Sequence, residues 1–149
     1  MSAEFERPDE ATLAEMRSLY TETVVDHAVN PRNAGSIQNP DGFASITGSC
    51  GDTMEMGLRV KDDRILIATF WTDGCAATIA AGSMTAELAK GKALTEALGI
   101  AQQDVLDALR GLPEGNRHCA LLAADTLKAA IGDYLVYKSE SWKRAYRRH

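Results

Sequence analysis

The sequence predicts an α+β fold in which a three-stranded antiparallel sheet packs against helices. Two observations carry this expectation. Strand patterns come first and follow one another directly between residues 43 and 72, whereas helical patterns occupy the chain from residue 76 onward. Strands that precede helices favour α+β over a parallel α/β sheet. With 149 residues, 45% of them hydrophobic and 25% charged, the chain suits one soluble domain with a real core.

The N-terminal part predicts one helix over residues 10–30. Its apolar and aromatic residues recur at steps of three and four, which is the period of a helical stripe: Leu13, Met16, Tyr20, Val24 and Ala28. The dipeptide Asn30-Pro31 ends this helix, because a residue before proline is pushed out of the α region. Residues 32–42 are rich in Asn, Gly, Ser, Pro and Asp and predict an irregular surface loop.

Three strands are expected next, joined as an antiparallel meander. A weak strand pattern covers residues 43–49, and residues 54–61 alternate cleanly between apolar and polar side chains. Asp62-Asp63 supplies a tight turn into residues 64–72, which are apolar on both faces. A strand of that kind is expected to be central or covered on both sides.

The remainder is predicted to be helical. Residues 76–90 are rich in small side chains and are followed by Gly91, a typical residue after a helix end. Short helices are expected at residues 95–98 and 102–110, and a long one at residues 118–137. The long helix should face the core with Leu121, Ala124, Leu127, Ile131 and Leu135.

Charge and hydropathy exclude several classes of protein. No run of about 18 apolar residues is present, so no membrane span is expected, and the acidic N-terminal residues lack the apolar stretch of a secretory signal. We therefore expect a cytoplasmic protein. The net charge of −5 includes a basic extension, residues 138–149, with five Lys or Arg against Glu140. The acidic body, residues 1–137, forms the expected domain and does not suit nucleic acid.

The three cysteines lie at the ends of expected elements. Cys50 ends the first strand, Cys75 lies between the last strand and a helix, and Cys119 begins the long helix. A free cysteine is most often a small buried hydrophobe, but none of these lies within an apolar stripe. A helix N-terminus lowers the pKa of a thiol and favours the thiolate that binds metal or attacks sulfur. Three cysteines are too few for a disulfide framework.

Two further donors accompany these sulfurs. Asp52 follows Cys50 by two residues, and His118 directly precedes Cys119. Each also has an ordinary explanation, since Asp is common in turns and His at a helix start. Together with the thiols they make four or five possible ligands, which suit Zn(II) or an iron–sulfur cluster. The sequence therefore predicts a metal site at one end of the fold.

Four blocks of sequence resemble the IscU/NifU family of iron–sulfur cluster assembly scaffolds, over about residues 19–134. One block is Tyr20-Thr-Glu-Thr-Val-Val-Asp-His27 with Asn30-Pro31-Arg32-Asn33-Ala34-Gly35. The second and third blocks are Cys50-Gly51-Asp52 and Gly74-Cys75-Ala76-Ala77. The last is His118-Cys119 with Ala123-Ala124-Asp125 and Lys128-Ala129-Ala130-Ile131. Four blocks in the same order, with all three cysteines aligned, make the resemblance specific.

The resemblance implies a scaffold and carrier rather than an enzyme. Such a protein receives sulfur from a cysteine desulfurase and iron from an iron donor, builds a transient 2Fe–2S cluster, and passes it to apo iron–sulfur acceptor proteins. By this likeness the ligands are Cys50, Cys75 and Cys119, with Asp52 or His118 completing the site. Cys119 matches the persulfide acceptor, a role that suits a low-pKa thiol beside a proton carrier.

One loop departs from the family. Where the family often carries Leu-Pro-Pro-Val-Lys, this chain has Leu112-Pro113-Glu114-Gly115-Asn116. We therefore expect weak or no binding to a DnaK-like chaperone.

Two other functions stay open from the residues. One is a zinc-bound sulfur-acceptor protein that activates a cysteine desulfurase. The other is a transferase with a Cys119–His118 dyad, although adjacent helical residues point about 100° apart, which disfavours a direct contact.

Overall fold

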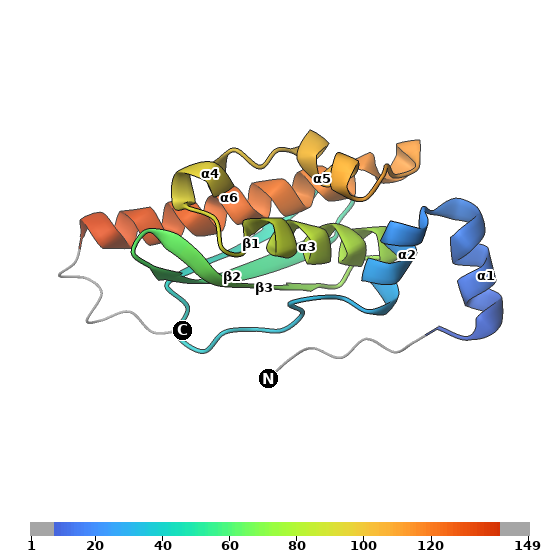
Figure 1. The fold of residues 1–149 in the computed structure, drawn as a ribbon, viewed down its shortest axis with the longest axis horizontal. Coiled ribbons are helices and arrows are strands. Elements are labelled where there is room, and N and C mark those ends of the chain that lie inside the picture. Colours follow the sequence, from blue (N-terminus) through green and yellow to red (C-terminus); the bar gives the residue numbers. More distant parts are fainter. Residues whose placement is uncertain (1–7, 141–149) are drawn as a thin grey trace.

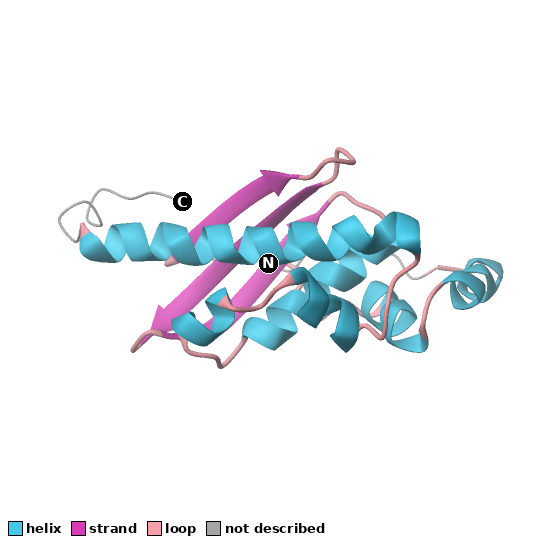
Figure 2. Cartoon of the chain, turned by 90° about the horizontal axis from the view of Figure 1, so that it is seen from above, coloured by secondary structure: helices cyan, strands magenta, loops and turns pink. Residues whose placement is uncertain are grey.

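The computed structural model describes residues 8–140 and confirms the α+β fold. Strands β1 (Gly42–Thr47), β2 (Thr53–Lys61) and β3 (Arg64–Thr72) form an antiparallel sheet in the order β1-β2-β3. Helices α3 (Ala76–Ala89), α4 (Leu94–Leu98), α5 (Gln102–Ala108) and α6 (Arg117–Ser139) lie over one face of this sheet (Figures 1 and 2). The 3-10 helix η1 (Glu114–Asn116) leads into α6. None of the helices in the described part of the chain combines the length and apolarity that a membrane span needs.

The core lies between the sheet and helices α3 and α6. In β2, Met54, Met56 and Leu58 are fully buried, as its alternating pattern predicts, and Val60 at the end of the same row is half-buried. Two glycines allow close approach: a Cβ on Gly42 would lie 2.5 Å from the carbonyl oxygen of Ala130 in α6, and one on Gly82 would lie 2.5 Å from the Phe70 ring. Small side chains on α3 therefore bring the helix close to the sheet, as the sequence indicated.

The predicted helix over residues 10–30 is wrong, because the chain forms two helices there. Helices α1 (Glu10–Leu19) and α2 (Glu22–Val29) are separated by extended backbone at Tyr20 and Thr21. The Thr21 side chain caps α2 by accepting from Val24 N, and its hydroxyl donates to the carbonyl of Leu109 at 2.7 Å. The cap on α2 and the hydrogen bond to Leu109 favour a break at Tyr20 and Thr21 over the single helix that the apolar stripe predicts.

The expectation that residues 64–72 form a strand that is either central or covered on both sides is also wrong. In the sheet β2 is central and β3 lies at the edge, so Leu66, Ile67 and Trp71 are exposed. Loop backbone covers part of this edge: Gly35 N donates to Phe70 O, and Ile65 N donates to Lys92 O. The edge is thus blunted by neighbouring loops rather than by a fourth strand.

The inward stripe expected on α6 is only partly right. Ala124, Leu127 and Ile131 are buried, whereas Leu121 is 44% exposed and Leu135 39%. The positions that face the sheet are instead filled largely by alanines: Ala120, Ala123 and Ala130. Because α6 lies close to β1, there is room only for small side chains between them, and Leu121 and Leu135 face outward. The basic extension begins in the last turns of α6 at Lys138, and residues 141–149 lie outside the described part.

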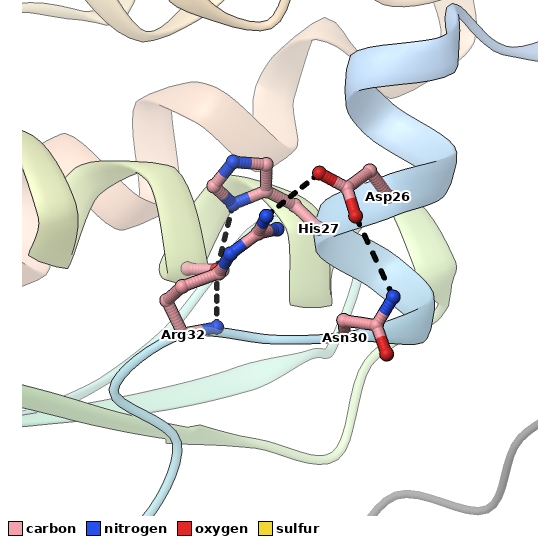
Figure 3. A network of polar contacts seen from close by, with 5 residues as sticks. Asp26, His27, Asn30 and Arg32 are labelled. Atoms are coloured by element: carbon pink, nitrogen blue, oxygen red, sulfur yellow. Dashed lines mark hydrogen bonds and ion pairs between the residues drawn. The ribbon is translucent and has the colours of Figure 1, made fainter.

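A polar network fastens α2 and the following loop to α3 (Figure 3). The buried His27 places Nδ1 2.8 Å from Ser83 Oγ in α3, and the backbone N–H of Arg32 donates to the same oxygen at 2.8 Å. Arg32 also pairs with Asp26 at 2.7 Å. The residues of the first family-like block therefore have a structural role in this network. They fix the loop of residues 30–41, which crosses the face of the sheet opposite to α3 and α6 (Figure 1).

Candidate functional site

The starts of β2, α3 and α6 meet at one end of the sheet, and the candidate ligands lie there. Cys75 is the N-cap of α3, Cys119 lies in the first turn of α6, and Asp52 directly precedes β2. The hydroxyl of Thr78 joins the three: it donates to Asp52 Oδ2 at 2.9 Å and lies 3.3 Å from Cys119 Sγ and 3.6 Å from Cys75 Sγ. The structure therefore brings two thiols and one carboxylate around a single buried hydroxyl.

His118 joins this group from the side of Cys119. Its Nε2 lies 3.8 Å from Cys119 Sγ, and the ring is half-buried. The 100° between adjacent helical residues predicts a geometrically poor hydrogen-bonded pair, and the separation of these two atoms agrees with that expectation. A distance of 3.8 Å is a long contact even for sulfur, so it places a proton carrier beside the thiol without a tight dyad.

Within residues 8–140, Cys50 makes no contact with the Thr78 hydroxyl, although its charge contributes to the raised pKa of Cys119. The expected strand end is wrong, because β1 ends at Thr47 and Cys50 is exposed in the turn before Asp52. Gly51 in that turn has φ +93°, a conformation that side chains rarely adopt. Within residues 8–140, no three side chains of His, Cys, Asp or Glu are arranged as they stand to hold a metal ion. The donors thus share one end of the fold but form an open site.

The pKa values of Cys75 and Cys119, the two thiols at helix starts, shift in opposite directions. Contact with Cys119, together with the backbone N–H groups of Thr78 and Ala77 in the first turn of α3, lowers the pKa of Cys75 from 9.0 to about 5. The pKa of Cys119 is instead raised, because it faces Cys75 and is desolvated by burial. The low pKa expected at helix starts is therefore confirmed for Cys75 and wrong for Cys119, a residue that is only 1% exposed.

Two residues at this end were missed by the sequence reasoning. Thr78 is fully buried and follows Cys75 by three residues, so the helical spacing that puts its hydroxyl near that sulfur was available as a signal. Tyr20 is half-buried, and desolvation and the charges of Cys75 and Cys119 raise the pKa of its hydroxyl. Tyr20 was assigned to a helical stripe and to the first family-like block, without a role at the site; the break between α1 and α2 brings it toward the thiols.

Comparison with known proteins gives consistent results. The profile of the family described as "NifU-like N terminal domain" matches residues 19–141. A protein of Archaeoglobus fulgidus named "Iron-sulfur cluster assembly scaffold protein IscU 1" is 49% identical over 117 residues, covering 78% of this chain and 76% of that protein. The Escherichia coli protein named "Iron-sulfur cluster assembly scaffold protein IscU" is 43% identical over 120 residues, covering 77% of this chain and 93% of its own.

A solved structure agrees at the level of the fold. The N-terminal part of a NifU-like protein from Brucella abortus superimposes with a TM-score of 0.63 at 21% identity, covering 81% of this chain and 97% of the other. At that identity the likeness concerns the fold alone. The family profile and the two close relatives carry the assignment further, since both relatives exceed 40% identity over more than three quarters of this chain. The chain therefore belongs to the NifU-like N-terminal domain family.

Proposed function

We propose that this protein is a scaffold on which a 2Fe–2S cluster is assembled and from which it is passed to apo-proteins. The observation that carries the proposal is the gathering of Cys75, Cys119 and Asp52 around Thr78, with Cys50 in the adjoining turn. Relatives at 43–49% identity bear the name of such a scaffold. The protein is then a carrier rather than an enzyme, because iron and sulfur are its cargo.

The donor set fits a cluster that is bound and then released. Thiolates hold iron firmly, whereas the carboxylate of Asp52 is a harder and weaker partner for iron. Stable electron-transfer clusters use four cysteines as a rule, and this chain has three. We take Cys50, Cys75 and Cys119 as the ligands, with Asp52 or His118 as the fourth. This mixed set supports a role in delivery.

Sulfur is expected to come from a cysteine desulfurase and iron from a separate iron donor. In the transfer step a thiolate attacks the outer sulfur of the desulfurase persulfide, forms a new S–S bond, and releases the desulfurase thiolate. The resemblance assigns this role to Cys119. Cys119 is buried and Cys75 is exposed, so the step requires Cys119 to become accessible at the desulfurase surface.

A zinc-bound sulfur acceptor is the second candidate, because thiols with a carboxylate or imidazole also suit Zn(II). Anaerobic reconstitution separates the two functions. The metal-free protein is incubated with ferrous iron, cysteine, a thiol reductant and a cysteine desulfurase, then studied by absorption spectroscopy and metal analysis. A scaffold turns brown and holds two iron and two sulfide per site, whereas a zinc-only acceptor stays colourless.

Variants locate the site in the same assay. Cys50→Ser, Cys75→Ser and Cys119→Ser should each abolish stable assembly, because each change removes one thiolate. Asp73→Ala is the matched control: Asp73 is close in sequence to Cys75, but its carboxylate accepts from the backbone N–H of Thr53 at 2.8 Å. If two of the three serine variants assemble a cluster with the wild-type spectrum, the shared site is refuted.

A further inference from the structure

Thr78 uses its hydroxyl differently from Thr126 and Thr85, the other buried threonines of α6 and α3. Thr126 in α6 donates to the carbonyl of Leu122 four residues earlier at 2.7 Å, the usual arrangement within a helix. Thr85 in α3 is equally buried, and its hydroxyl has no partner among the described residues. Thr78 instead points its hydroxyl out of α3 toward a side chain that precedes β2 and a sulfur of α6. A buried hydroxyl directed across three elements suits a positioning role.

The single proton of this hydroxyl determines the pattern of contacts. It is donated to Asp52 Oδ2, which leaves only the oxygen lone pairs to face the sulfurs of Cys119 and Cys75. A hydrogen bond to a carboxylate is stronger than one between neutral groups. Asp52 Oδ1 makes no hydrogen bond within residues 8–140, so one oxygen is fixed and the other is left free.

We propose that Thr78 is a positioning residue that acts through Asp52, holding this carboxylate toward the two sulfurs so that Oδ1 is presented to a metal. The proposal rests on the function proposed above and names a residue that the donor set alone does not include. Carboxylate ligands of metals are themselves held by hydrogen bonds, and loss of such a partner typically weakens metal binding by about 10–100-fold. Thr78 has the geometry of that partner.

Zinc affinity of the metal-free protein tests the proposal without any cluster chemistry. Zn²⁺ is titrated in competition with a chromophoric chelator, and circular dichroism reports the fold of each variant. Thr78→Val removes the hydroxyl at nearly constant volume and should weaken Zn²⁺ binding by about tenfold or more. Thr78→Ser keeps the hydroxyl and should bind within about threefold of wild type. Thr85→Val, the matched control in the same helix, should leave affinity unchanged.

The Asp52→Ala background separates positioning from simple packing. There Thr78→Val should produce no further loss of Zn²⁺ affinity, because the carboxylate through which Thr78 acts is gone. An undiminished tenfold loss in that background means that Thr78 acts on the sulfurs and overturns the proposal. A folded Thr78→Val protein with wild-type affinity also overturns it.

Failure of the proposed function gives a different result. Wild-type protein that binds Zn²⁺ in a Thr78-dependent manner but assembles no cluster leaves the positioning role intact and refutes the scaffold. Wild-type protein that assembles a cluster while Thr78→Val keeps full Zn²⁺ affinity refutes only the positioning role. A wild type that binds neither Zn²⁺ nor a cluster overturns both.

Discussion

Gly74 is the most constrained position beside the site, and Gly74→Ala should disrupt it. A Cβ at this position would lie 2.6 Å from Thr78 Cβ, 2.7 Å from Thr78 Cγ2 and 2.7 Å from Asp52 Oδ2. Ordinary contact begins at 3.4 Å, so these neighbours must retreat by about 0.7–0.8 Å. Such a movement separates Asp52 from the Thr78 hydroxyl, which it now contacts at 2.9 Å.

The expected cost combines two effects. Overpacking by one methyl group costs about 1–3 kcal/mol, and loss of a hydrogen bond to a charged group costs about 1.5–3 kcal/mol. Because the two overlap, we expect about 3 kcal/mol of lost stability, which lowers the melting temperature by about 10 °C in a domain of this size. Zn²⁺ affinity should fall as well, because the methyl group pushes the carboxylate away from its present position.

Urea unfolding of the metal-free, reduced protein, followed by far-ultraviolet circular dichroism, measures the loss. Gly115→Ala is the matched control, because a Cβ there has no neighbour within 4 Å; its stability should change by less than about 0.5 kcal/mol. If Gly74→Ala is as stable as Gly115→Ala and binds Zn²⁺ like wild type, the packing of Gly74 against Thr78 and Asp52 is wrong.

Three other predictions follow from the same structure. Because its pKa is about 5, Cys75 should react with iodoacetamide at a nearly constant rate between pH 7 and 9, whereas the reaction of a thiol with a pKa of 9.0 accelerates about 50-fold. Peptide mass spectrometry identifies the modified residue, and a steep rise in the rate at Cys75 would contradict the prediction. Burial and the charge of Arg32 lower the pKa of His27 against the opposing effects of Asp26 and Glu87. The unfolded state therefore binds more protons below about pH 6.5, so the stability that neutral His27 contributes is present above that pH and is lost as the pH falls. His27→Asn should therefore reduce the decline in the urea midpoint between pH 7.5 and pH 5.5. A variant whose midpoint declines as much as that of wild type would refute this prediction. In α6, the Cβ that Gly132→Ala adds would have no neighbour within 4 Å, so this variant should raise the unfolding free energy by about 0.5–1 kcal/mol. A decrease in the unfolding free energy would contradict the open space at this position.

Local sequence patterns were sufficient to predict the elements that are determined by interactions between residues close in sequence. The alternation in residues 54–61 predicted β2 and its buried face, and residues 64–72 are the bounds of β3 itself. Gly91, with φ +84°, follows the end of α3 as expected. Side-chain periodicity and turn chemistry act over a few residues, so a sequence reports them well.

Interactions between distant elements decided the features that were wrong. The break between α1 and α2 depends on a hydrogen bond from Thr21 to Leu109, which no local pattern reveals. The apolar side chains of β3 predicted cover on both faces, but the order of strands in the sheet put this strand at an edge. On α6, the close contact with β1 decided that alanines rather than Leu121 and Leu135 face inward.

The sequence by itself supplied the candidate residues for the site: three cysteines, with Asp52 and His118 beside two of them. Only the tertiary structure decided how these groups act on one another. It joined Asp52, Cys75 and Cys119 through the hydroxyl of Thr78 and left Cys50 in an exposed turn. It also gave the two helix-borne thiols opposite pKa shifts, because a pKa depends on burial and on neighbouring charges, and these exist only once the starts of β2, α3 and α6 have met.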